Sequence, residues 1–215
     1  MKKHYQHIIW DWNGTLINDM WLCVDILNPL LEKYGQPPIS HPFYLKHFDF
    51  PVKNFYKKAG FDFDRVPFEI VGTEWMDIYR QRWRECSLHS QARQLLQDLR
   101  MGGISQSIVS ASDLNLLNEC LHHFDLEACF IKISGLDNHF AHGKIDIARH
   151  HIQELGIQSD KIIFIGDTLH DYHVARSIGV DCILFSGGHH SKNKLLTTKT
   201  PVIDSLDEIR KILDK

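Results

Sequence analysis

Five short apolar runs, each followed at once by a small or acidic residue, constrain this chain more than any other feature of the sequence. The runs are HIIW, SIV, CFIKI, KIIFI and DCILF. Runs of this length that do not alternate with polar residues are typical of strands buried on both faces of a parallel sheet. The residues that directly follow them are Asp11, Ser110, Ser134, Gly166 and Ser186.

The segments between these runs have helical spacing. Apolar residues recur every three or four positions over 92–99 and again over 147–155, where Gly156 ends the pattern. Strand and helix therefore alternate along the chain. This order predicts an α/β protein with a Rossmann-like parallel sheet and right-handed crossovers.

The stretch between the first and second predicted strands is too long for a single crossover. Helical spacing over 20–31 and 71–82 indicates two helices there, and we interpret the proline-containing segments near 37–42 and 51 as loops between them. A chain of 215 residues can form one domain with an insertion. We predict a core of residues 1–16 and 88–215 and an inserted helical subdomain of residues 17–87.

The overall charge argues against a polyanionic or membrane partner. The formal net charge is -3 and the pI is about 6.6, so no positive field would attract nucleic acid or an anionic membrane surface. The apolar run before Asp11 is too short for a signal peptide or a membrane span. We expect a cytoplasmic protein without nucleic-acid or membrane partners, and the sequence leaves its oligomeric state open.

Cysteine and histidine patterns give no metal signature. The five cysteines are scattered and form no CxxC pair, which argues against a disulfide framework or a zinc knuckle and favours reduced, buried thiols. The fifteen histidines include three doublets, but adjacent residues on a helix point to different faces and no HExxH motif is present. A transition-metal site is therefore disfavoured.

The segment DWNGTL follows the first predicted strand. In an open parallel sheet, ligands bind beyond the carboxyl ends of the strands, which is where this segment places Asp11. Gly14 and Thr15 are predicted to form a tight turn whose backbone N–H groups can face a phosphate. Ser110 and Ala111 follow the second strand and are expected at the same edge.

Two further segments bring charge to this edge. Lys144 starts a predicted helix after Gly143, and GDTLHD supplies Asp167 and Asp171 after the KIIFI strand. Carboxylates at the ends of two strands repel each other unless a hard divalent cation lies between them, which predicts a Mg²⁺ site. Asp11 could then attack phosphorus while a hydroxyl and an ammonium stabilise the phosphate oxygens.

These four segments, in this order, resemble the motifs of the haloacid dehalogenase superfamily, in its subgroup with a helical cap after the first strand. The resemblance covers nearly the whole chain, and ILNPLLEKYG and FSGGHHS are similar to stretches of phosphoglycolate phosphatases. It implies a nucleophile at Asp11, a phosphate-binding hydroxyl at Ser110, the family lysine at Lys144, and an acidic pair at Asp167 and Asp171.

The resemblance also implies the ligands of the metal. They would be Asp11, the backbone carbonyl of Asn13, and Asp167, with Asp171 in support. The expected activity is a magnesium-dependent phosphatase that acts on a small phosphorylated metabolite, with phosphoglycolate as one candidate, through an aspartyl phosphate at Asp11.

One residue departs from the family pattern. Phosphatases of this family normally carry a second aspartate two residues after the nucleophile as general acid and base, and here that residue is Asn13. An amide cannot usefully give or accept a proton, and such catalysis is worth about 10²–10⁴ in rate. Two alternatives therefore stay open: an impaired relative that binds phosphorylated ligands or a partner protein, and a phosphotransferase or phosphatase limited to good leaving groups. His170 could replace the missing acid or be an ordinary surface histidine.

Overall fold

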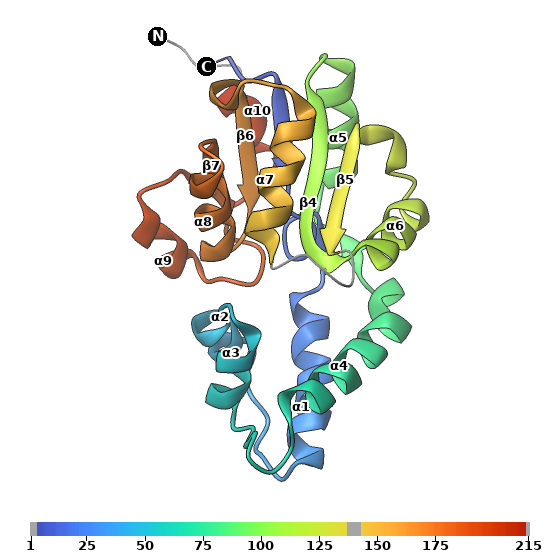
Figure 1. Ribbon diagram of the computed structural model, residues 1–215, viewed down its shortest axis with the longest axis vertical. Helices are drawn as coiled ribbons and strands as arrows, with labels where there is room; N and C mark the ends of the chain where they lie inside the picture. The colour runs from blue at the N-terminus through green and yellow to red at the C-terminus, as the bar shows by residue number, and fades with distance from the viewer. Residues whose placement is uncertain (1–3, 137–142, 214–215) are drawn as a thin grey trace.

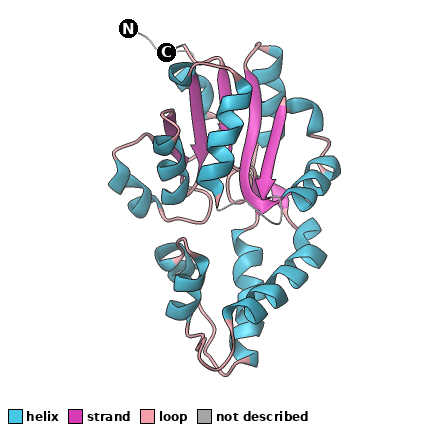
Figure 2. Cartoon of the chain, in the orientation of Figure 1, coloured by secondary structure: helices cyan, strands magenta, loops and turns pink. Residues whose placement is uncertain are grey.

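The protein, described over residues 4–136 and 143–213 by a computed structural model, is built on a six-stranded sheet with the strand order β5-β4-β1-β6-β7-β8. Every pairing in this sheet is parallel. The predicted α/β class, with helices around a sheet, is therefore confirmed (Figure 2). β8 is an additional edge strand. The strands are β1 (His7–Trp10), β4 (Ser105–Asp113), β5 (Lys132–Leu136), β6 (Ile162–Gly166), β7 (Asp181–Phe185) and β8 (Val202–Ile203).

Helices cover both faces of the sheet because the strands are apolar on both sides. In β1, Ile8 and Trp10 belong to a core cluster that contains apolar residues of α5 and α6, whereas Ile9 belongs to a second cluster with α7 and α8. This split follows the two-residue period of a strand. The helices around the sheet are α5 (Ala92–Met101), α6 (Leu114–His123), α7 (Lys144–Leu155), α8 (Leu169–Ser177), α9 (Lys192–Leu195) and α10 (Glu208–Leu213).

A helical insertion separates β1 from β4. It is entered and left through a short antiparallel ribbon of β2 (Ile17–Asn18) and β3 (Ser87–Leu88). Figure 1 shows its helices beyond the ends to which the arrows of β4, β5 and β6 point. The predicted division at residues 17 and 87 falls within this ribbon and stays a prediction. The inserted helices are α1 (Met20–Lys33), α2 (His41–His47), α3 (Val52–Ala59) and α4 (Phe68–Arg82).

Two of these helices lie where the prolines had indicated only loops. Ser40 caps α2 by accepting a hydrogen bond from the Phe43 N–H at 3.3 Å, and Pro42 lies in the first turn. Proline is tolerated there because its missing N–H would have no partner within the helix. α3 begins directly after Pro51. The predicted loops are present over 36–40 and 48–51, but the sequence pattern missed the helix that follows each of them.

Two strands also run further than the apolar pattern predicts. β4 continues past Ser110 to Asp113, with its register against β5 shifting between Val109 and Asp113. Ser134 lies within β5 rather than after it. Polar residues can continue both strands because backbone pairing, rather than apolar side chains, carries them beyond the core.

The short 3₁₀ helices are η1 (Trp83–Glu85), η2 (Glu127–Cys129), η3 (Ser159–Lys161) and η4 (Leu196–Thr198).

All five cysteines are buried and none forms a disulfide, which confirms the predicted reduced thiols. Of the helices in the described part of the chain, none combines the length and apolar character needed to cross a membrane.

Candidate active site

The sheet order brings three predicted site residues to one edge. β4, β1 and β6 are adjacent; Asp11 and Asp167 directly follow β1 and β6, and Ser110 lies in the carboxyl-terminal half of β4. The backbone N–H of Asp11 extends the β1–β6 pairing by donating to the Ile165 carbonyl at 2.8 Å. All three side chains are buried, with Asp11 6% exposed.

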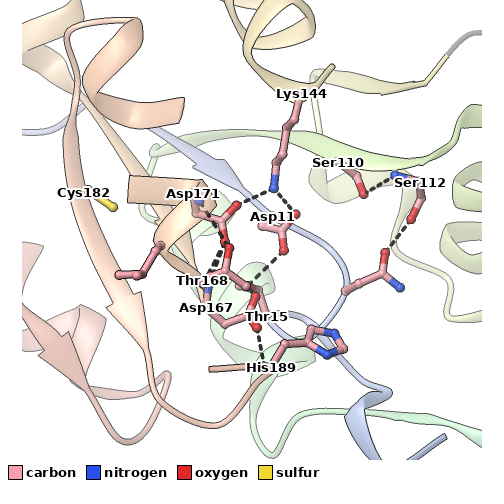
Figure 3. Close-up of polar contacts among 12 residues, drawn as sticks. Asp11, Thr15, Ser110, Ser112, Lys144, Asp167, Thr168, Asp171, Cys182 and His189 are labelled. Carbon is pink, nitrogen blue, oxygen red and sulfur yellow. Dashed lines mark hydrogen bonds and ion pairs between the residues drawn. The ribbon is translucent and has the colours of Figure 1, made fainter. Parts of the chain in front are cut away.

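Lys144, the first residue of α7, lies between two of the carboxylates (Figure 3). Its ammonium group forms ion pairs with Oδ1 of Asp11 and, at 2.5 Å, with Oδ1 of Asp171. Burial alone would lower the pKa of Lys144, but the two carboxylates outweigh it and raise that pKa. Lys144 is therefore held as a cation beside Asp11.

Asp171 has both carboxylate oxygens engaged. Oδ2 accepts hydrogen bonds from the Thr168 N–H at 2.9 Å and the Thr168 hydroxyl at 2.6 Å, in a capping box at the start of α8. Oδ1 binds Lys144. The pKa of Asp171 is lowered because these partners outweigh the effect of burial. This arrangement suits Asp171 to the role of positioning Lys144 rather than to that of a direct metal ligand.

The backbone N–H groups of Gly14 and Thr15, which are predicted to face a phosphate, instead donate to oxygens of the protein. The Gly14 N–H donates to Oδ1 of Asp19 at 2.9 Å, and the Thr15 N–H donates to the Trp12 carbonyl at 3.3 Å. The Thr15 hydroxyl instead donates to Oδ1 of Asp167 at 2.9 Å. Phosphate binding by these two N–H groups stays a prediction and would require these hydrogen bonds to be exchanged.

The Asp167 carboxylate lies so close to Gly14 and Gly188 that neither position has room for a side chain. Gly14 has φ +74°, and a Cβ built on Gly14 or on Gly188 would overlap the Asp167 carboxylate. The backbone N–H of His189 donates to Oδ2 of Asp167 at 2.6 Å. The GG pair of FSGGHHS was the only sequence signal of this approach.

The acidic cluster fits a magnesium ion. Asp11, Asp167 and Asp171 each offer a carboxylate oxygen, and these atoms all lie within 4.8 Å of one another. Burial is the main cause that raises the pKa of Asp11 well above its usual range and that of Asp167 to about 6, even with Lys144 present. The Lys144 ammonium therefore does not fully balance the charge of the three carboxylates. A set of oxygen donors of this kind suits a hard cation.

Asn13 is fixed by residues that the sequence patterns did not indicate. Its amide nitrogen donates to Oδ2 of Asp19 at 2.7 Å and to the Tyr79 hydroxyl at 2.9 Å. Its amide oxygen accepts from the Ser112 hydroxyl at 2.5 Å. Tyr79 belongs to α4, so the insertion and the nucleophile loop share one hydrogen-bonded network.

His189 carries a buried positive charge in the same network. Its Nε2 lies 3.3 Å from Oδ1 of Asp19, and its Nδ1 shares a hydrogen bond with the Tyr44 hydroxyl at 3.0 Å. Burial disfavours the imidazolium, but Asp19 outweighs this and raises the pKa of His189 to about 9. No local pattern could pair residues so far apart in the chain: His189 lies in a histidine doublet noted above, whereas Asp19 lies beyond DWNGTL and no pattern indicated it.

These residues open onto one cavity of about 490 Å³. The predicted residues that line it are Asp11, Asn13, Ser110, Ala111, Lys144 and Asp171, whereas Gly14, Thr15 and Asp167 are not lining residues. His170 also lines it, with its ring 4.6 Å from that of Phe50, and burial lowers the pKa of His170.

Residues 8–185 match the profile of the haloacid dehalogenase-like hydrolases. The chain belongs to this family, as the resemblance implied, and is thus an enzyme of hydrolase type.

Individual relatives are more distant. The chain is 24% identical over 212 residues to tyrosine-protein kinase PtkA of Mycobacterium tuberculosis, covering 97% of this chain and 72% of that protein. It is 26% identical over 222 residues to a 5'-nucleotidase of Pseudomonas aeruginosa, covering 98% and 96%. A crystal structure described as a predicted phosphatase from Clostridium acetobutylicum shares the fold, with a TM-score of 0.81, 22% identity, and coverage of 99% and 100%.

Proposed function

We propose that this hydrolase is a magnesium-dependent phosphatase that cleaves a small phosphorylated molecule through an aspartyl phosphate at Asp11. The observation that carries the proposal is the buried Asp11 carboxylate, which faces the cavity between Lys144 and the Asp167 carboxylate. Two relatives described as a 5'-nucleotidase and a predicted phosphatase support the reaction class. A cytoplasmic location, without nucleic-acid or membrane partners, is part of the proposal.

The reaction would proceed in two displacements. An oxygen of the Asp11 carboxylate attacks phosphorus, and the bond from phosphorus to the ester oxygen breaks with its electron pair leaving on that oxygen. Water then attacks the aspartyl phosphate, releasing inorganic phosphate and restoring the carboxylate. Lys144 and the Ser110 hydroxyl would stabilise the negative phosphoryl oxygens.

The chain supplies a fitting set of residues for the metal. Asp11, Asp167 and the backbone carbonyl of Asn13 would hold Mg²⁺, and Asp171 would hold Lys144 in place. When bound, the ion supplies positive charge to the phosphoryl oxygens. The hydroxyl of Thr15 and the N–H of His189 orient Asp167 for this task.

The proposal is tested by a screen of phosphorylated metabolites, including phosphoglycolate and acetyl phosphate, with and without Mg²⁺. Beryllium fluoride with Mg²⁺ should give a phosphoryl mimic on Asp11, visible by crystallography. Turnover would exclude the alternative that the chain only binds a phosphorylated ligand or a partner. If no substrate turns over and no adduct forms at saturating Mg²⁺, that alternative is favoured.

Asp167→Asn is expected to weaken Mg²⁺ binding by more than about 100-fold, because replacing a metal-bound carboxylate costs at least as much as replacing its supporting residues. Isothermal titration of Mg²⁺ into the protein measures this without any substrate. Asp160→Asn removes an exposed carboxylate from η3 and should leave the affinity unchanged. Equal affinities for wild type and Asp167→Asn would place the ion elsewhere.

Asn13→Asp is expected to raise kcat/KM for alkyl phosphates by as much as about 10²-fold, because it restores a general acid. The new carboxyl would replace an amide nitrogen that lies 2.7 Å from Oδ2 of Asp19, and two carboxylates so close raise the pKa of one of them. A proton would thus be available near neutral pH. Kinetics on alkyl and aryl phosphates should show a much smaller gain for the aryl esters.

The double variant Asn13→Asp, Asp19→Asn removes the repulsion and should shift the acidic group's apparent pKa downward. If wild type cleaves alkyl and aryl esters equally well and Asn13→Asp brings no gain, another acid is at work, and His170 is the first residue to replace.

A further inference from the structure

The wall of the cavity opposite Asp11 is aromatic. Trp75 stacks on Tyr79 with ring centroids 5.1 Å apart, and Phe48 stacks on Tyr44 at 4.8 Å. Phe48 also lies 5.3 Å from the His189 ring. The aromatic wall, as we define it, consists of Tyr44, Phe48, Phe50, Phe55, Trp75 and Tyr79, all from the segment between Met20 and Arg82.

This wall lies next to the catalytic residues. The Tyr79 hydroxyl binds Asn13 at 2.9 Å, so Trp75 is separated from the nucleophile loop by a single ring. A flat apolar group attached to a phosphate at Asp11 could therefore contact these rings. Offset and edge-to-face ring pairs stabilise such contacts beyond the burial of apolar area.

The cavity suits a two-carbon acid poorly. Among the cations that line it in the described part of the chain, Lys144 and His189 are each paired with carboxylates, and Arg80 is exposed. The carboxylate of phosphoglycolate would thus face aromatic carbon rather than a buried cation. A volume of about 490 Å³ also lies within the range of roughly 300–1,000 Å³ that is typical of pockets for much larger ligands.

Asn13 gives a second, independent constraint on the leaving group. Both ends of its amide are engaged with neighbouring residues, and an amide cannot protonate the departing oxygen. Unless another residue such as His170 protonates it, the leaving group departs as an anion. A phenol has a pKa of about 10, whereas an alcohol is close to bulk water at about 15.7, so an aryl oxide leaves far more readily.

We propose that the substrates are aryl phosphate monoesters, in which the ring is bonded directly to the ester oxygen and rests on the aromatic wall. This proposal rests on the proposed phosphatase function. Asp11 displaces the aryl oxide, which takes a proton from solvent, and water then releases inorganic phosphate from Asp11. One aryl phosphate and one water thus give one phenol and one inorganic phosphate.

Four substrates separate ring binding from leaving-group acidity. With Mg²⁺ present, kcat/KM for phenyl phosphate should exceed that for benzyl phosphate, which has the ring but an alkyl leaving group, by at least about 100-fold. Phosphoglycolate should be as poor as benzyl phosphate. Acetyl phosphate, which has a good leaving group and no ring, should be cleaved with a KM well above that of phenyl phosphate.

Each other outcome has a distinct meaning. If acetyl phosphate is cleaved but benzyl phosphate or phosphoglycolate matches phenyl phosphate, the aryl proposal is rejected and the phosphatase stands. If none of them is cleaved at saturating Mg²⁺, the proposed phosphatase itself fails.

Variants of α4 test the aromatic wall directly. Trp75→Ala should raise KM for phenyl phosphate about tenfold, with a smaller effect on acetyl phosphate. Ile70→Ala alters an exposed residue of the same helix and should change neither. Trp75→Leu keeps apolar volume should Trp75→Ala fail to fold. Equal KM values for wild type and a folded Trp75 variant would overturn the assignment of the wall.

Discussion

Asp11→Asn is expected to lower kcat by about 10⁶-fold, the scale of loss seen when a catalytic nucleophile is removed from a hydrolase. The amide oxygen is too weak a nucleophile to attack phosphorus, although the side chain keeps its shape. Burial already raises the pKa of the Asp11 carboxyl, so its neutral replacement should not destabilise the fold. Lys144 also keeps its ion pair with Asp171.

Rapid-quench kinetics combined with mass spectrometry of the intact protein measure this prediction. Wild type should show a phosphoprotein during turnover, and Asp11→Asn should show none. Asp64→Asn, an exposed change in the loop before α4, serves as the matched control. Activity above about 1% in a correctly folded Asp11→Asn protein would mean that another residue is the nucleophile.

Acidification from pH 6.5 to 5 is expected to lower the contribution of two buried neutral histidines to the free energy of unfolding by about 3 kcal/mol. His7 in β1 shares hydrogen bonds of 2.7 Å with the hydroxyls of Ser105 and Ser107. His151 in α7 shares bonds of the same length with the hydroxyls of Ser107 and Ser134. Burial lowers the pKa of His7 to about 4 and that of His151 to about 3.

The sign follows from proton binding in the two states. Below pH 6.5 the unfolded chain protonates both histidines while the folded protein protonates neither, so stability falls by about 1.4 kcal/mol per pH unit for each histidine. Above about pH 7.5 the histidines are neutral in both states, so this contribution is complete and these groups cause no further change. Urea unfolding at pH 7.5, 6.5, 5.5 and 5.0 measures the slope.

The histidine doublet at 150 and 151 offers a matched pair of variants. His151→Gln should lower the slope by as much as about 1.4 kcal/mol per pH unit, the share of one histidine. His150→Gln should leave the slope unchanged, because the side chain of His150 is 79% exposed. A slope that is the same in His151→Gln and in wild type would show that His151 does not cause the acid sensitivity.

The parts of the site that the sequence predicted are those set by the sheet. Apolar runs that are buried on both faces can only be strands of a covered parallel sheet, and the residues at their carboxyl ends share one edge. The residue pattern alone therefore places Asp11, Ser110 and Asp167 together, and the strand order agrees. The pattern was less accurate for the strand ends, because backbone pairing carries β4 past Ser110 to Asp113.

The contacts between distant segments could not be predicted in the same way. Asp19 binds His189, and Tyr79 of the insertion binds Asn13, through side chains whose meeting depends on how the insertion packs over the core. The buried histidine and serine network likewise joins α7 to three neighbouring strands.

The sequence by itself therefore determined the α/β sheet, the edge where the chemistry takes place and the absence of the usual acid at Asn13, because each of these follows from local pattern and residue type. Only the tertiary structure decided that Asn13 is tied to Asp19, that His189 is charged and that the cavity has an aromatic wall. The physical reason is that desolvation, charge pairing and cavity shape depend on neighbours that the chain brings together only when it is folded.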